Sequence, residues 1–302
     1  MVHDCVVIGG GPAGLTAAIY LARFHLSVMV LEDQRSRAAL IPVSHNHAGF
    51  PAGIPGTELL NRMRRQAESY GAVLRQAKAE GLARAGTRLR IATDTGEFHA
   101  ETVLLATGVV NLRPDMTDTQ HDEALARGLL RYCPVCDGYE VTDRRIALLG
   151  SGEHALKEAE FMRSYSPDVT LVAPFGRHDF TTEQRALIAR WNIHCIDGPL
   201  RGIELLTRGI ALRLDGGTRH FDTLYAALGT KPRSELACAI GAETGPDGAI
   251  LVDCHQMTSV TGLYAAGDVV KGLDQISNAM GHAAVAATAM RNAICSVRPL
   301  RR

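Results

Sequence analysis

Residues 5–14 read Cys-Val-Val-Ile-Gly-Gly-Gly-Pro-Ala-Gly, and this stretch decides the fold. A short β-branched run ends in a glycine-rich turn, and an apolar helical stretch and a second strand, Ser27–Leu31, follow it. This order of strand, glycine turn, helix and strand is typical of the βαβ unit that binds a dinucleotide. In such a turn Gly9 permits the tight bend, Gly11 lets the backbone approach a pyrophosphate, and Gly14 lets the helix pack against the strand.

The same arrangement recurs about 140 residues later in the chain. Residues 145–149 form a largely apolar run that ends in a second glycine turn, before another helical stretch and strand. A single Gly-x-Gly-x-x-Gly pattern occurs often by chance, but two copies with the right flanking elements indicate two nucleotide-binding domains. We therefore predict a second pyrophosphate cradle at Gly150, Gly152 and Ala155.

The remaining segments fit two nucleotide domains, one inserted into the other. Each glycine unit is followed by alternating strands, over residues 88–107 and 210–229 respectively. We predict an α/β fold of two Rossmann-like, three-layer dinucleotide-binding domains. The first comprises residues 1–112 and 245–302, and the second, residues 113–244, is inserted into it and carries a cysteine pair.

Composition excludes several classes of protein. Of 302 residues, 46% are hydrophobic and 21% charged, which is typical of a folded globular chain, and 32 basic residues balance 32 acidic ones. A net charge of zero gives no reason to expect a nucleic-acid or membrane partner, and no apolar stretch reaches the roughly 20 residues of a membrane span. Seven scattered cysteines and a start that runs directly into a strand indicate a cytoplasmic chain without a signal peptide.

Carboxylates stand at the ends of two predicted strands of the first domain. Glu32 ends the second strand, followed by Asp33, and can accept a hydrogen bond from a ribose 2′-hydroxyl, which argues against a 2′-phosphate there. Asp268 follows an apolar strand and Gly267. The alternatives are a glycine turn that serves packing alone and an Asp268 that only caps a helix.

Cys133 and Cys136 form the Cys-x-x-Cys pair of the chain. Such a pair is either redox-active or half of a zinc site, and no second Cys-x-x-Cys supplies further ligands, so we favour redox chemistry and expect no metal. If a helix begins at the pair, its free amides favour the thiolate, and the adjacent Asp137 can exchange a proton. Inert packing is the remaining alternative, and the other five cysteines, including Cys295 near the end, are expected to be structural.

The two glycine motifs, Ala106-Thr107-Gly108, the Cys-x-x-Cys pair and Ala265-Ala266-Gly267-Asp268 stand in the order and spacing of low-molecular-weight thioredoxin reductases. The chain resembles this family of homodimeric FAD flavoproteins from about residue 2 to residue 294. The resemblance implies that Asp268 binds the ribityl chain of FAD, that Cys136 faces the flavin, that Cys133 attacks the partner disulfide and that Asp137 is the acid–base partner. The predicted cofactor-binding residues are Gly9, Gly11, Pro12, Ala13, Gly14, Glu32, Asp33, Asn46, Ala106, Thr107, Gly108, Gly267, Asp268, Gln275 and Ile276 for FAD, and Gly150, Gly152 and Ala155 for a pyridine nucleotide.

The second nucleotide site departs from the family pattern. Members that use NADPH usually carry His-Arg-Arg where this chain has Ala173-Pro174-Phe175, and Glu153-His154 replaces their Asp-Ser. The family's usual arginine before Gln275 is also replaced, by Asp274. NADPH binding is therefore left open, and reduced ferredoxin, flavodoxin or a small dithiol are alternative electron donors.

Three functions follow from these motifs. The first is an FAD-dependent disulfide oxidoreductase that passes electrons through Cys133 and Cys136 to thioredoxin or a similar disulfide. The second is a dithiol oxidase that runs in the opposite direction with O2 as acceptor, although members of that branch usually carry His at the position of Asp137. The third is a non-catalytic flavin redox sensor. His282 is expected where the flavin-side helix begins, as a proton acceptor or as a structural residue.

Overall fold

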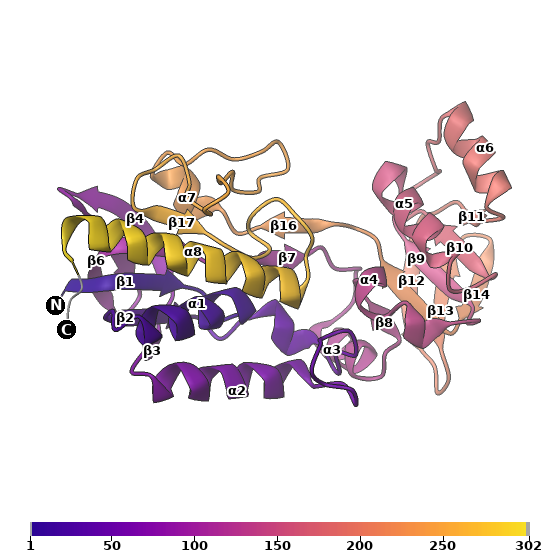
Figure 1. Cartoon of the computed structure of the whole chain (residues 1–302). Helices are drawn as coiled ribbons and strands as arrows, with labels where there is room; N and C mark the ends of the chain where they lie inside the picture. The colour runs from indigo at the N-terminus through magenta and orange to yellow at the C-terminus, as the bar shows by residue number, and fades with distance from the viewer. Residues whose placement is uncertain (1, 300–302) are drawn as a thin grey trace. The chain divides into compact units, whose positions relative to one another are not determined.

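The computed structural model describes residues 2–299, which form two compact units (Figure 1). Unit 1 comprises residues up to 43, 54–110 and those from 231 onward, and unit 2 comprises residues 44–53 and 111–230. The insertion of one dinucleotide-binding domain into the other is confirmed. The chain leaves unit 1 after residue 110 and returns at 231, where the sequence predicted crossings after 112 and 244.

Unit 1 is built on a seven-stranded sheet in the order β3-β2-β1-β6-β5-β4, with β17 also paired to β6. Strands β1, β2, β3, β6 and β17 run parallel to one another, whereas β5 pairs antiparallel with β6 and β4 pairs antiparallel with β5. All five residues of β2 are buried, as expected for a parallel strand covered on both faces. The strands are β1 (Val2–Ile8), β2 (Val28–Glu32), β3 (Val73–Gln76), β4 (Ala79–Ala85), β5 (Arg88–Thr93), β6 (Gly96–Leu105) and β17 (Leu263–Ala265).

Helices α1 (Pro12–Arg23) and α8 (Ile276–Val297) pack against each other on one face of this sheet (Figure 1). Alanines of both helices share one buried cluster, and such small side chains let two helix axes approach closely. Helix α2 (Gly56–Ser69) packs beside α1, and α7 (Glu235–Ala239) contributes to the cluster on the opposite face. These contacts fix the glycine turn at the start of α1.

Unit 2 repeats the plan with a five-stranded parallel sheet in the order β11-β10-β9-β15-β8. Its strands are β8 (Leu130–Arg131), β9 (Ile146–Leu149), β10 (Val169–Val172), β11 (His194–Ile196) and β15 (Thr223–Ala226). A three-stranded antiparallel sheet consists of β12 (Leu200–Leu205), β13 (Ile210–Leu214) and β14 (Gly217–Phe221). Its helices are α3 (Asp118–Ala126), α4 (Pro134–Asp137), α5 (Gly152–Met162) and α6 (Thr182–Arg190).

The two crossings between the units are short strands. They are β7 (Val109–Asn111) and β16 (Thr230–Pro232), which pair with each other. Two 3-10 helices, η1 (Arg37–Leu40) and η2 (Tyr139–Val141), complete the elements between residues 2 and 299. None of the helices in that range combines the length and the hydropathy that a membrane crossing demands.

One expected helix boundary is wrong. The sequence predicted that the helix of the last segment begins at His282, but α8 begins at Ile276, with Gln275 in extended conformation as its N-cap. Ala279, Ala283 and Ala286 are buried against α1, so the apolar stripe extends the helix back beyond the histidine. His282 therefore lies inside α8 and not at its start.

Candidate functional site

The glycine turn of unit 1 leaves no room for side chains. Gly9 has φ +116°, and a Cβ on Gly14 would lie 1.9 Å from the carbonyl oxygen of Gly9. A Cβ on Gly10 would lie 2.0 Å from Oε2 of Glu32, so the carboxylate that ends β2 packs directly against the turn. The predicted neighbour Ala106 is also in place, because its carbonyl oxygen would lie 2.2 Å from a Cβ on Gly9.

The start of α1 is open to an anion. Its N-cap is Gly11, in extended conformation, and no side chain caps the first turn. The first turn, which includes Pro12 and Ala13, carries no acidic residue. The free N–H groups and the positive end of the helix dipole therefore face the turn unopposed, which is the arrangement that binds phosphates. Gly267 adjoins this helix, since a Cβ there would lie 2.9 Å from that of Ala13.

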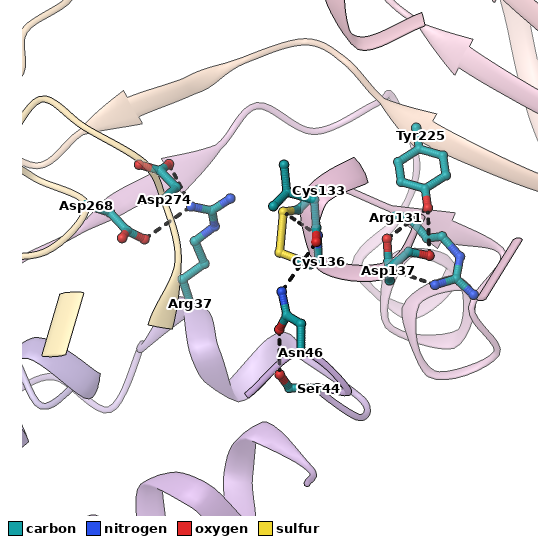
Figure 2. Close-up of a disulfide and its surroundings, with 11 residues drawn as sticks. Arg37, Ser44, Asn46, Arg131, Cys133, Cys136, Asp137, Tyr225, Asp268 and Asp274 are labelled. Carbon is teal, nitrogen blue, oxygen red and sulfur yellow. Dashed lines mark hydrogen bonds and ion pairs between the residues drawn. A yellow bond between two sulfur atoms is a disulfide. The ribbon is translucent and has the colours of Figure 1, made fainter. Parts of the chain in front are cut away.

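Both predicted carboxylates of unit 1 are paired with arginines. Glu32 is 7% exposed and accepts hydrogen bonds from Arg64 of α2, at 3.1 Å from Nε and 2.9 Å from Nη2. Asp268 accepts from Nη1 of Arg37 at 3.2 Å, and the same nitrogen donates to Asp274 at 2.8 Å (Figure 2). Each carboxylate thus has a fixed orientation before any cofactor binds.

Burial changes the acidity of one of these groups. It raises the pKa of Asp268 to about 6, and the nearby charge of Asp274 acts in the same direction. The guanidinium of Arg37 opposes both effects and lowers the pKa of this carboxyl. Asp268 is consequently close to half-ionised in weakly acidic solution, in contrast to an ordinary surface aspartate.

The other predicted cofactor residues of unit 1 follow strands β2 and β6 or stand at the start of α8. Thr107 donates its hydroxyl hydrogen to the carbonyl of Arg233 at 2.7 Å, and the carbonyl of Gly108 accepts from the Arg233 amide at 2.9 Å. Asp33 is exposed and accepts from the amide of Arg35 at 3.1 Å. Gln275 and Ile276 stand at the start of α8.

Two predicted residues have surroundings that the sequence did not indicate. Asn46 belongs to unit 2, where its Nδ2 donates to the carbonyl of Val135 in α4 at 3.3 Å and its Oδ1 accepts from Ser44 at 3.2 Å. His282 has a buried Nδ1 without a hydrogen-bond partner in the described chain, and burial lowers its pKa. This histidine is therefore neutral at pH 7.

The residues of unit 1 fit an FAD molecule. Side-chain-free glycines, an uncapped helix start without acidic residues and a buried carboxylate at the end of β2 are what an adenine dinucleotide requires. Glu32 would hold the ribose hydroxyls, the backbone N–H groups of Gly11, Ala13 and Gly14 would hold the pyrophosphate, and Asp268 would accept from further hydroxyl groups. When bound, FAD supplies a carrier of two electrons.

The cysteine pair stands at the start of the short helix α4 in unit 2. Cys133 is its N-cap, and Cys133 and Cys136 form a disulfide with their Cα atoms 5.3 Å apart (Figure 2). The amide of Cys136 donates to Sγ of Cys133 at 3.2 Å. A hydrogen bond of this kind favours a thiolate on Cys133 once the disulfide is reduced. Both cysteines are partly exposed, so a partner can reach them.

Asp137, the last residue of α4, is held by two donors. Its Oδ2 accepts from Nη1 of Arg131 at 2.6 Å, and its Oδ1 accepts from the hydroxyl of Tyr225 at 2.8 Å. Figure 2 shows this carboxylate on the side of α4 away from the two sulfur atoms. Burial raises the pKa of Asp137, while the charge of Arg131 and the hydrogen bond from Tyr225 lower it. The network ties the redox helix to strands β8 and β15.

The second glycine turn keeps its shape, but an acidic residue stands in the first turn of the helix that follows it. A Cβ on Gly150 would lie 2.4 Å from the carbonyl oxygen of Ala227, and Ala155 is fully buried beside it. The first turn of α5, however, carries Glu153, which pairs with Lys157. A carboxylate there opposes a pyrophosphate, in contrast to the start of α1.

The basic residues nearest to the end of β10 are Arg177 and His178, and the arginine pair of the family pattern is missing. Ala173 is fully buried there and Phe175 is 84% exposed. His178 is buried, with Nε2 3.3 Å from the carbonyl of Leu171, and burial lowers its pKa, so it is uncharged at pH 7. Within residues 173–178, Arg177 is therefore the exposed basic side chain that could contact a 2′-phosphate.

Sequence reasoning missed four residues that hold functional side chains: Arg37, Arg64, Arg131 and Tyr225. One of them had a usable signal. Tyr225 lies in the apolar run of β15, and a tyrosine in a fully buried strand needs a partner for its hydroxyl. The arginines had none, because nothing local predicts which carboxylate each contacts.

The chain is similar to known proteins over most of its length. The family described as pyridine nucleotide-disulphide oxidoreductase matches residues 3–283. The bifunctional thioredoxin reductase/thioredoxin of Mycobacterium leprae is 34% identical over 89% of this chain, which spans 60% of that longer relative. The thioredoxin reductase of Mycolicibacterium smegmatis is 31% identical, over 89% of each chain. The thioredoxin reductase structure from Streptococcus pyogenes superposes with a TM-score of 0.90 at 25% identity, covering 98% of this chain and 99% of that one.

Proposed function

The chain belongs to the pyridine nucleotide-disulphide oxidoreductases, and on this basis we propose that it is an FAD-dependent disulfide oxidoreductase acting on thioredoxin or a similar disulfide. The observation that carries the proposal is the Cys133–Cys136 disulfide at the partly exposed start of α4. The cradle of unit 1 supports FAD as the cofactor. Thioredoxin as partner follows from the names of the relatives.

The two cysteines would act in two stages, reduction of their own disulfide and then exchange with the disulfide of the partner. The Cys133–Cys136 disulfide takes up two electrons and two protons and becomes a pair of thiols. The thiolate of Cys133 then attacks the partner disulfide, and one partner sulfur leaves as a thiol after protonation. Cys136 attacks the resulting mixed disulfide and re-forms the internal bond, so that the partner leaves with both electrons and two protons. The amide of Cys136 assists by donating to Sγ of Cys133.

We further propose that NADPH is not the preferred electron donor. Glu153 in the first turn of α5, the buried Ala173 and the uncharged His178 support this proposal. A reduced protein or a small dithiol is then the source of electrons. The same observation favours a second candidate, a dithiol oxidase in which a small dithiol reduces Cys133–Cys136 and O2 accepts the electrons as hydrogen peroxide.

Anaerobic mixing of the holoenzyme with NADPH, NADH or dithiothreitol tests the donor. We expect dithiothreitol to bleach the flavin band, and NADPH to act slowly and without more than about a threefold preference over NADH, since the single Arg177 replaces the arginine pair of the family pattern. Fast bleaching that is selective for NADPH would contradict the proposed donor. A pre-reduced enzyme should then reduce oxidised thioredoxin, and Cys133→Ser should abolish this, whereas Cys195→Ser, at an exposed unpaired cysteine of the same unit, should not.

Peroxide formation separates the two candidate functions. A reductase transfers its electrons to thioredoxin faster than to O2, whereas a dithiol oxidase forms peroxide from a small dithiol and leaves thioredoxin oxidised. Bleaching without turnover of any acceptor would identify a redox sensor.

We also propose a homodimer, from the family resemblance, and a cytoplasmic location, which is supported by five cysteines without disulfides. Size-exclusion chromatography tests the dimer.

A further inference from the structure

Arg37 joins two carboxylates that lie far from it in the sequence. Its Nη1 is 3.2 Å from Oδ2 of Asp268 and 2.8 Å from Oδ2 of Asp274 (Figure 2). All three side chains are largely buried, with 22%, 21% and 30% of their surface exposed. An ion pair at this degree of burial is screened much less by salt than one on an open surface.

The position of Arg37 places it at the dinucleotide cradle of unit 1. The preceding residue, Ser36, has its hydroxyl 3.2 Å from where a Cβ on Gly11 would lie, so this segment packs on the turn that would hold the pyrophosphate. Its other two guanidinium nitrogens, Nε and Nη2, contact no protein acceptor within residues 2–299. Those N–H groups therefore remain available to an anionic ligand.

The charge balance shows why an arginine is needed here. Without Arg37, the carboxylates of Asp268 and Asp274 would stand next to each other without a counter-charge, at a site that must also accept the negative phosphates of a dinucleotide. Two neighbouring negative charges disfavour each other's ionisation and repel a further anion such as a phosphate. One guanidinium can hold both aspartates and still present donors to the cofactor.

From this arrangement we propose that Arg37 is a binding residue for FAD in unit 1, and that it positions Asp268 for the hydroxyl groups of the cofactor. Asp274 is the second carboxylate that holds the guanidinium in place. The inference rests on the proposed function, because it takes FAD as the ligand. The family usually carries an arginine just before Gln275, where this chain has the negatively charged Asp274. We infer that Arg37, from η1, supplies the positive charge in its place.

The test is a titration of flavin-free protein with FAD, followed by the quenching of FAD fluorescence. We expect Arg37→Met to raise the FAD dissociation constant at least tenfold, and Arg37→Lys to restore part of the loss because it keeps the charge. Asp274→Asn should weaken binding less than Arg37→Met, since Asp268 still holds the guanidinium.

Arg90→Met is the matched control, since Arg90 of β5 pairs with Glu97 at 2.8 Å, the distance of the Arg37–Asp274 pair, but on an exposed strand. Its FAD affinity should stay within twofold of the wild type. Circular dichroism of the flavin-free proteins shows whether each variant is folded. If Arg37→Met does not fold, the FAD affinity of Arg37→Lys is compared with that of the wild type instead. Wild-type affinity in a folded Arg37→Met would overturn the inference, whereas a wild-type protein that binds no FAD would contradict the proposed function.

Discussion

At the scale of single residues, the candidate site consists of carboxylates whose state is set by arginines. Glu32 is held by Arg64, Asp137 by Arg131 and Asp268 by Arg37. In each case the guanidinium offsets the cost of burying a negative charge. The carboxylates are thus oriented in advance, which lowers the conformational entropy that these side chains lose when a ligand binds.

The titration of Asp268 gives a prediction about pH. Its pKa in the folded protein is about 6, above the value near 3.8 of an ordinary aspartate, so the folded state binds more protons than the unfolded state between these values. The free energy of unfolding of the flavin-free protein should therefore rise by about 1 kcal/mol as the pH falls from 7 to 5. Urea denaturation at both pH values measures this change.

The matched variant is Asp268→Asn, which cannot titrate. Subtracting its pH dependence from that of the wild type removes the contribution of all other groups, and the difference should show the gain at pH 5. If the two proteins changed in parallel between pH 7 and pH 5, the raised pKa of Asp268 would be wrong.

At the scale of elements, the glycine turn and the helix it starts form one construction. The N–H groups of α1 are left without caps, and the close approach of Gly14 to Gly9 draws the helix against β1. Two helical glycines then respond to the same substitution in opposite ways. A Cβ added at Gly14 would lie 1.9 Å from a carbonyl oxygen, whereas a Cβ added at Gly281 of α8 would meet no atom within 4 Å.

We therefore expect Gly14→Ala to destabilise the protein by more than about 3 kcal/mol, or to prevent folding, because backbone must move to admit the methyl group. Gly281→Ala should instead stabilise it by about 0.5–1 kcal/mol, through helix propensity alone. Thermal unfolding of the flavin-free proteins measures both. A Gly14→Ala variant as stable as Gly281→Ala would show that the turn is not closed as described.

Sequence patterns predicted the elements better than the contacts between side chains. Both glycine turns, the strand that ends at Glu32 and the helix at the cysteine pair depend on interactions between neighbours in the chain, which a sequence displays directly. The pairing of Arg37 with Asp268 joins residues 231 positions apart and depends on how η1 packs against the segment before α8. No periodicity encodes such a contact. The start of α8 was misplaced for a related reason, because burial against α1 decides it.

At the scale of the whole molecule, each unit carries the residues for one half of the proposed reaction. Unit 1 offers a cradle that fits FAD, and unit 2 carries the Cys133–Cys136 disulfide together with a second glycine turn. Function as a disulfide oxidoreductase requires that the two redox groups exchange electrons within one protein. The number of electrons that the holoenzyme accepts measures this directly.

An anaerobic titration with dithionite, followed by the flavin absorbance and by thiol counting, is the most direct test. We expect the wild type to need about two equivalents of dithionite for full bleaching of the flavin, one for the disulfide and one for the flavin. The reduced protein should then contain two additional thiols. The variant Cys133→Ser/Cys136→Ser should need about one equivalent and gain none. A wild type that is bleached by one equivalent, with its disulfide still intact, would contradict electron exchange between the flavin and the cysteine pair.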